Sequence, residues 1–300
     1  MRIGIFGGDT ANGPIDAIVD AARAAADDGC ASFWLPQIFG MDALTALAVA
    51  GREVPGIELG TAVVPTYPRH PAMLAAQALT TQAIIGGRLA LGIGLSHQVV
   101  IESMFGLSFD KPARHMRKYL EILVPLVHSG SVSFAGETLT GHVGLDVKGA
   151  TPFPILVAAL GTKMLELAGT VADGTVTWMT GPATIESHIV PTITVAAERA
   201  GRPAPRVGVG LPVCVTDDEA AARERAARLF ESYGTLPSYR AMLDKEGAGG
   251  PSDVAIVGDE AAVSAQIERL GAIGATDLVA NEFGSSDERT RTRALLRSLV

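Results

Sequence analysis

Apolar residues follow two patterns that alternate along most of this chain. Short apolar runs, such as Ile3 to Phe6 and Ser32 to Leu35, have the length and composition of buried strands. Each is followed by a longer segment with one apolar face, such as Pro14 to Asp28, where Gly29 ends the predicted helix. This alternation predicts parallel strands joined by crossover helices, which is the α/β class.

About eight strands follow from this pattern, the number that closes a (β/α)8 TIM barrel. The predicted strands are residues 3–6, 32–35, 57–64, 88–93, 155–158, 175–178, 207–215 and 278–280. The predicted helices are residues 14–28, 43–50, 72–85, 112–130, 163–171, 185–200, 219–231 and 263–271. The connection 239–250 is polar and glycine-rich. In such a barrel, side chains fill the interior and the loops after the strands carry the chemistry.

A β-hairpin-like insertion is predicted at residues 132–147, a segment bounded by glycines. We therefore expect a single barrel domain over residues 1–300, with an insertion at approximately 131–150. A doubly wound sheet is the alternative, but it normally places Gly-x-Gly-x-x-Gly after its first strand. Here the fingerprint is absent, because Gly92 and Gly94 are followed by His97 at the third glycine position.

Composition narrows the classes of partner. The 300 residues are 48% hydrophobic, carry a formal net charge of −8 and contain no run of Lys or Arg. We therefore expect a small-molecule substrate and neither a nucleic-acid nor a membrane partner. Cys30 and Cys214 lie far apart, so we expect no metal and no disulfide framework. The absence of a leader pattern and of an apolar run of about 18 residues predicts a cytoplasmic location.

The third predicted strand leads into a run from Leu59 to Pro71 that contains three prolines. Arg69 and His70 stand at its end, directly before a proline that suits the first turn of a helix. Two interpretations stay open. The run is either a binding loop at the barrel mouth or a rigid loop in which Arg69 pairs with a neighbouring carboxylate.

Two further turns place polar groups directly after strands. Ser96 and His97 follow the fourth strand, where they either face a ligand or cap a helix and bond to the backbone. Residues 161–163, Gly-Thr-Lys, lead into a helix, and they either bind a phosphate or form an ordinary helix start. Four other histidines are expected to be structural or solvated: His115, His128, His142 and His188.

Together these segments resemble the luciferase-like monooxygenase superfamily, specifically its actinobacterial branch of coenzyme F420-dependent oxidoreductases. The resemblance spans nearly the whole chain and is carried by residues 35–40 with 42–45, 59–71, 92–97, 114–120 and 158–161. It implies a bacterial-luciferase-like barrel, a coenzyme lying across the carboxyl ends of the strands, and a homodimer. It also implies a non-prolyl cis peptide bond in the third strand, which the motif places at Ala62–Val63.

The coenzyme implied is F420, with FMN as the alternative. The residues that match coenzyme contacts of the family are Gln37, Thr61, Ala62, Val63, Gly94, Leu95, Ser96, His97, Val100, Ala159, Leu160, Gly161, Thr162 and Lys163. Several family members have a histidine or aspartate where this chain has Gln37, and an amide cannot act as an acid at neutral pH. His97 is therefore the candidate catalytic proton donor, by its matching position and its ordinary pKa near 6.5.

The implied reaction is hydride transfer between the deazaflavin and a small organic substrate. We expect an apolar substrate wall, although large apolar residues after strands also simply pack. Its candidates are Phe39, Met41, Tyr67, Trp178 and Met179. Two alternatives remain. One is an FMN-dependent two-component monooxygenase, and the other is a non-catalytic flavin- or deazaflavin-binding protein, which the lack of an ionisable residue at Gln37 favours.

Overall fold

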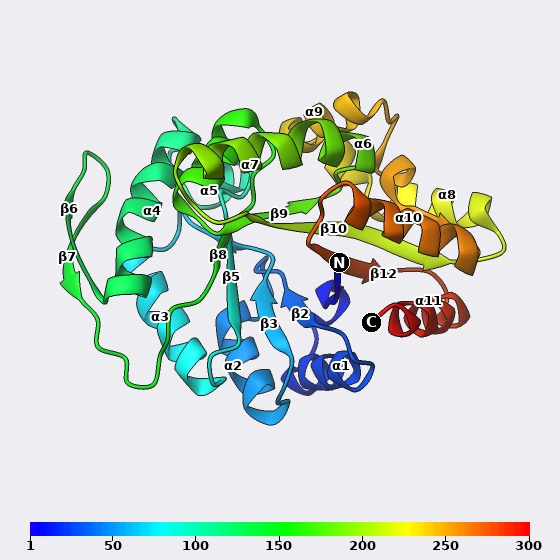
Figure 1. The fold of residues 1–300 in the computed structure, drawn as a ribbon, viewed down its shortest axis with the longest axis horizontal. Helices are drawn as coiled ribbons and strands as arrows, with labels where there is room; N and C mark the ends of the chain where they lie inside the picture. The colour runs from blue at the N-terminus through cyan, green and yellow to red at the C-terminus, as the bar shows by residue number, and fades with distance from the viewer.

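Eight parallel strands form a closed ring in the computed structural model, which describes residues 1–300 (Figure 1). They are β1 (Arg2–Phe6), β2 (Ser32–Leu35), β3 (Glu58–Thr61), β5 (Leu89–Gly94), β8 (Ile155–Val157), β9 (Gly174–Trp178), β10 (Arg206–Val215) and β12 (Asp277–Glu282). The ring closes because β12 pairs with β1 on one side and with β10 on the other. The predicted (β/α)8 barrel is confirmed, and each ring strand overlaps its predicted range.

The barrel interior is packed around Trp34, whose side chain is fully buried. Gly60 leaves room for the indole, because a Cβ there would stand 2.2 Å from Cε3 of Trp34. The rest of this inner cluster consists of Ala90, Leu156, Val176 and Val279. Since side chains fill the interior, a ligand has to bind at one end of the barrel.

The amino-terminal end of the barrel is occupied by a network of ion pairs. The Arg206 guanidinium donates to Asp277 at 2.6 and 2.9 Å and to Glu58 at 2.6 Å. Burial acts to lower the pKa of Arg206, but the bonds to these two carboxylates outweigh it and raise the pKa. This end is therefore satisfied by its own charges, and the carboxyl ends of the strands form the mouth available for chemistry.

Helices cover the outside of the barrel (Figure 1). They are α1 (Ile15–Asp27), α2 (Ala43–Glu53), α3 (Pro71–Ile84), α4 (Pro112–Ser129), α5 (Thr162–Val171), α7 (Val190–Arg199), α8 (Glu219–Leu229), α9 (Pro237–Glu246), α10 (Glu260–Ala272) and α11 (Ser286–Ser298). Helix α7 begins later than predicted, because the short α6 (Pro182–Thr184) and a π-helical turn at Ile185–Ile189 precede it. None of the helices combines the length and apolarity needed to cross a membrane.

Four elements lie outside the predicted ranges: the short α6, α9, α11 and β11 (Ile256–Gly258). The polar, glycine-rich segment 239–250, for which no helix is predicted, is mostly occupied by α9. Helix α9 buries only Met242 and Leu243, and α11 buries only Thr292 and Leu296. With so few buried positions, neither helix shows the apolar periodicity on which the prediction depends.

The predicted hairpin insertion is present between α4 and β8. Its strands, β6 (Ser131–Ala135) and β7 (Thr140–Gly144), pair antiparallel in a separate sheet. Gly141 lies against α4, where a Cβ would stand 3.0 Å from Cγ2 of Ile122. Nε2 of His70 lies 3.1 Å from the Thr140 carbonyl oxygen. These contacts fix the hairpin on the outside of the barrel.

Candidate active site

One side of the mouth is formed where β3 ends. The chain leaves β3 at Thr61 and resumes pairing with β5 in β4 (Val64–Pro65). Between them the Ala62–Val63 peptide bond is cis, where the family resemblance places it. The Thr61 hydroxyl donates to the Gly92 carbonyl at 2.7 Å and accepts from the Gly92 N–H at 2.9 Å. Because Thr61 is fully buried and its hydroxyl is bonded in this way, its side chain is not available to a ligand.

Gly92 and Gly94 of β5 lack side chains because the Thr61 to Val63 segment lies against them. A Cβ at Gly92 would stand 2.0 Å from the Thr61 carbonyl oxygen, and a Cβ at Gly94 would stand 2.5 Å from Cγ2 of Val63. Neither glycine has a positive φ. Glycine is therefore required here by close approach of the Thr61 carbonyl at Gly92 and of the Val63 side chain at Gly94, and not by an unusual backbone conformation.

The turn after β5 places Ser96 and His97 at the mouth. Ser96 has a φ of 61°, in the left-handed region that non-glycine residues seldom occupy. The His97 carbonyl accepts from the N–H groups of Val100 and Ile101 at 3.0 Å, where a π-helical turn begins. The imidazole is half-buried, and burial lowers the pKa of His97 below its ordinary value of 6.5. Its neutral form therefore predominates at pH 7.

Helix α5 starts at the mouth without a side-chain cap. Its first intrahelical bonds run from the N–H groups of Met164 and Leu165 to the Gly161 carbonyl, both at 3.0 Å. Residues 161–163, which precede these donors, are all exposed. Free amides at a helix start, together with a hydroxyl and a cation, can bind a phosphate.

The loop before α5 is held by neighbouring side chains. Nε2 of His188 lies 2.8 Å from the Leu160 carbonyl oxygen. The Thr175 hydroxyl donates to the Val157 carbonyl at 2.8 Å and accepts from the Ala159 N–H at 3.3 Å. The expectation of a structural role is thus confirmed for His188. Ala159 is fully buried, so its side chain is not available to a ligand.

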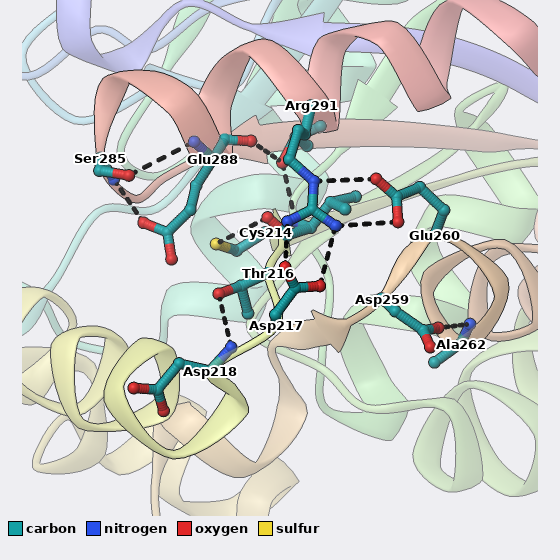
Figure 2. A network of polar contacts seen from close by, with 12 residues as sticks. Cys214, Thr216, Asp217, Asp218, Asp259, Glu260, Ala262, Ser285, Glu288 and Arg291 are labelled. Carbon is teal, nitrogen blue, oxygen red and sulfur yellow. Dashed lines mark hydrogen bonds and ion pairs between the residues drawn. The ribbon is translucent and has the colours of Figure 1, made fainter.

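The loops after β10 and β12 carry carboxylates, although this is where many barrels bind phosphate (Figure 2). Helices α8, α10 and α11 begin there, capped by the side chains of Asp218, Asp259 and Ser285. Arg291 lies between Asp217 and Glu260, with four hydrogen bonds of 2.9 to 3.1 Å. These three helix starts are therefore already satisfied by side chains of the protein.

Gln37, at the end of β2, is oriented by helix α2. Its Oε1 accepts the N–H of Ala43 at 2.7 Å. Because the donor is a backbone N–H, the oxygen of the amide must face the helix and the NH2 group must point away from it. Gln37 therefore offers a hydrogen-bond donor, and no proton for transfer, to a ligand at the mouth.

Arg69 has the structural role that one of the two interpretations gave it. Its guanidinium pairs with Asp42, the N-cap of α2, and donates to Gln77 at 2.8 Å. The Gln77 amide donates to Asp42 at 2.7 Å, which closes the triangle. Burial acts to raise the pKa of Asp42, and hydrogen bonds from Arg69 and Thr45 outweigh it and lower that pKa. Arg69 thus joins the loop to α2 and α3.

Two of the predicted wall residues reach the mouth or its rim. Trp178 stacks on Phe6, with ring centroids 5.3 Å apart. Phe39 is 61% exposed, and its ring meets that of Phe105 edge-on. Both aromatic residues therefore keep surface that a substrate can contact.

The other wall residues are taken up by packing. Met179 is fully buried in the outer core, so the expectation that it lines the wall is wrong. Met41 packs partly against the same core. Tyr67 lies between His115 and Phe109, at centroid distances of 3.9 and 5.2 Å, and so has no free ring face. Burial also lowers the pKa of His115 to about 4.

Three further aromatic residues at the mouth are not predicted from the sequence: Phe6, Tyr233 and Tyr239. Tyr239 approaches His97 with ring centroids 5.8 Å apart, and Tyr233 meets Trp178 edge-on at 5.9 Å. Both tyrosines lie in the segment between β10 and β11, which contains helices and no strand. No local motif marks them, and their position follows from the path of the chain.

The described residues contain no group of three or more His, Cys, Asp or Glu side chains placed to hold a metal ion.

The sequence matches the family model described as luciferase-like monooxygenase over residues 1–277. A 5,10-methylenetetrahydromethanopterin reductase from Methanolobus tindarius is 29% identical over 237 residues, covering 78% of this chain and 72% of that protein.

A putative coenzyme F420-dependent oxidoreductase from Mycobacterium tuberculosis is 31% identical over 189 residues, covering 58% of this chain and 54% of that protein. Among solved structures, the coenzyme F420-dependent tetrahydromethanopterin reductase from Methanopyrus kandleri superposes with a TM-score of 0.83 at 22% identity. That superposition covers 100% of this chain and 98% of the other. At this level of identity, the likeness shows the shared barrel fold.

Proposed function

This chain belongs to the luciferase-like monooxygenase family, and on that premise we propose that it is a coenzyme F420-dependent oxidoreductase. The proposed reaction is hydride transfer between the deazaflavin and a small organic substrate at the carboxyl mouth of the barrel. Relatives named for coenzyme F420 support this choice. The observation that carries the proposal is that the uncapped start of α5 and the half-buried imidazole of His97 both follow barrel strands at this mouth.

The residues at the mouth fit a ring coenzyme that bears a phosphate. The N–H groups of residues 161–163 and the Lys163 ammonium would hold the phosphate. Ala62 and Val63, half-buried above the inner cluster, would back the ring. The residues of the turn after β5 would lie along its edge: Gly94, Leu95, Ser96 and Val100. Gln37 would donate its NH2 group to an acceptor atom.

The protein's proposed chemical contribution is a proton at His97. When bound, the coenzyme would supply or take a hydride as a two-electron unit. Reduction of a C=C, C=N or C=O group uses that hydride and one proton from the His97 imidazolium, and oxidation of an alcohol returns both. Because burial lowers the pKa of His97, the neutral imidazole predominates at pH 7 and is ready to accept a proton.

One alternative has an observation of its own. Gln37 has its oxygen bound to the Ala43 N–H and has no proton to transfer. This supports a protein that binds a flavin or deazaflavin without catalysis. The family is described as luciferase-like monooxygenases, and one solved monooxygenase with this fold binds FMN, so an FMN-dependent monooxygenase is the second alternative.

Titration of the apoprotein with coenzyme F420 and, separately, with FMN distinguishes these assignments. Fluorescence quenching gives the two dissociation constants, and we expect Kd for F420 to be lower by roughly tenfold or more. Lys163→Gln should weaken F420 binding by about three- to tenfold, since a charge-assisted phosphate contact is lost. Lys148→Gln, which removes an exposed lysine before β8, is the matched control and should change nothing.

The other possible results of this titration support different assignments. A preference for FMN would move the protein to the oxygen-activating assignment. Tight F420 binding with no turnover of any acceptor would support the binding protein. Binding of neither coenzyme would overturn the proposal.

The proposal includes a homodimer in the cytoplasm. The outer face of α3 supports the dimer, because no residue from Pro71 to Ile84 is charged. Met73, Thr80 and Ile84 are exposed on one side of this helix. When a second copy of the chain covers this face, its apolar surface is removed from water, which favours the dimer.

A further inference from the structure

Five side chains form a continuous arc from the barrel floor to the turn after β5, and we call them the aromatic arc: Phe6, Trp178, Tyr233, Tyr239 and His97. Their successive ring centroids are 5.3, 5.9, 5.1 and 5.8 Å apart. These are the separations at which aromatic rings attract one another. Three members stand on barrel strands or the turn after one, whereas Tyr233 and Tyr239 come from the segment 230–246.

The segment 230–246 is attached to the barrel at both ends. Phe230 is buried and meets Trp178 and Phe283 edge-on, each at 6.0 Å. At the other end, the Glu246 carboxylate accepts the N–H groups of Ala183 and Thr184 at 3.0 and 2.7 Å. Glu246 thereby caps α6, which lies beside α9 in Figure 1.

Neighbouring residues make room for this attachment. A Cβ at Gly181 would stand 2.3 Å from Cδ of Glu246, so only glycine admits the carboxylate. The Thr184 hydroxyl donates to the Met242 carbonyl at 3.3 Å. The Glu246 carboxylate and this hydrogen bond therefore both hold α9 against α6, and α9 carries Tyr239 to His97.

The arc carries no charge at neutral pH. Burial raises the pKa of both tyrosines, so their phenols stay protonated, and burial lowers the pKa of His97, so its imidazole is neutral. The nearby Arg240 is turned away, because it donates to Asp244 and to two backbone carbonyls. A buried anion or cation would find no counter-charge on this surface, whereas an apolar ring would find aromatic contacts.

We propose that the segment 230–246 is the substrate-selecting wall of the site. This wall admits neutral, largely apolar ring compounds that bear a hydrogen-bond acceptor such as a carbonyl oxygen. Glu246 is the residue that positions the wall. The proposal rests on the proposed function, which puts the substrate at this mouth. Tyr239 contributes ring surface and a phenolic donor, and Trp178 forms the floor.

Tryptophan fluorescence tests the attachment without any turnover. The chain has two tryptophans. Trp34 is fully buried inside the barrel, so quenching by acrylamide reports on Trp178. Glu246→Ala should raise the quenchable fraction, and Glu246→Gln, which keeps one acceptor oxygen, should restore part of the protection. Glu231→Ala, at an exposed position of the same segment, is the matched control and should behave as the native protein.

Binding of two ring probes tests the selectivity. Cyclohexanone and cyclohexanecarboxylate share a ring and differ in charge, and their binding to the F420-loaded protein is measured by isothermal titration. We expect cyclohexanone to bind at least about tenfold more tightly, and Tyr239→Ala and Glu246→Ala to weaken it by about tenfold while Kd for F420 stays within about twofold. Tyr239→Phe should retain the contribution of the ring.

The outcomes separate the two proposals. Failure of F420 to bind the native protein would remove the proposed function itself. Normal F420 binding with equal affinity for both probes, or with full cyclohexanone affinity in Glu246→Ala and Tyr239→Ala, would overturn the substrate-selecting wall and leave the proposed function standing.

Discussion

Burial lowers the pKa of the His97 imidazole below its ordinary value of 6.5. The side chain packs near the Tyr239 ring, while its backbone carbonyl is bonded to the next turn. The position of His97 is therefore fixed by the backbone, and its protonation is set by how much water reaches the ring.

Replacing His97 by Asn should lower kcat by about a hundredfold or more, the usual contribution of a general acid or base, and change Kd for F420 by no more than about twofold.

In the native protein, substrate reduction needs the protonated imidazole of His97, so the rate of reduction should fall as pH rises through a pKa below 6.5. Alcohol oxidation should rise over the same interval. Steady-state kinetics between about pH 5 and 8 checks both directions. Unchanged turnover in His97→Asn would remove this residue from the mechanism.

Motifs in the sequence located the residues of this mouth better than they predicted what each side chain does. The cis bond at Ala62–Val63 and the exposed start of α5 lie where the family resemblance put them. Burial and hydrogen bonding decided the rest: Thr61 is bonded to β5, and Met179 is inside the core. These depend on residues distant in sequence, which no local pattern contains.

Helix α11 shows how an element without a broad apolar face is held in place. It buries two side chains, Thr292 and Leu296. Four of its arginines instead pair with carboxylates on other elements, at Asp9, Asp217, Glu260, Glu282 and Asp28. Helix α4, by contrast, buries seven side chains. The last helix is thus attached mainly by charge.

Salt should therefore loosen α11 selectively, since exposed ion pairs are screened and buried apolar contacts are not. Amide hydrogen exchange in α11 should speed up by roughly threefold or more between about 0.05 and 1 M NaCl, and exchange in α4 should stay nearly constant. Peptide-resolved mass spectrometry measures both helices in one experiment. Equal responses would show that α11 is held by packing.

The same contrast explains which elements could be predicted. The ring strands and α1 to α5 show runs or faces of apolar residues, and their periodicity is visible in the sequence. Helices α9 and α11 bind through Glu246 and through arginines, and charged residues in a sequence do not reveal their partners. Strand β11 is three residues long and pairs only with the end of β10.

On the scale of the whole molecule, exposed apolar side chains occur on two neighbouring outer helices, α2 and α3. Val49 of α2 is exposed beside the uncharged α3 face with Met73 and Ile84. Contiguous exposed apolar side chains on neighbouring helices are typical of contacts between subunits.

We expect the native chain to be dimeric at about 10 μM. The Met73→Glu/Ile84→Glu double variant should be monomeric at the same concentration, because burying unpaired carboxylates in an apolar interface is unfavourable. Analytical ultracentrifugation gives the mass directly. Val195→Glu adds a charge at an exposed apolar position of α7 and serves as the control. A native chain that sediments as a monomer would remove the dimer from the proposal.

The contact between β5 and the Thr61 to Val63 segment also sets how this scaffold can be diversified. Gly92 and Gly94 tolerate no added carbon, since a Cβ would lie 2.0 and 2.5 Å from neighbouring atoms. Phe39, by contrast, is largely exposed at the rim of the same mouth. A mutant library aimed at new substrates gains viable members by randomising the rim and loses them by randomising β5. New specificity in this barrel is therefore expected to arise from changes in its loops and not from changes at Gly92 and Gly94.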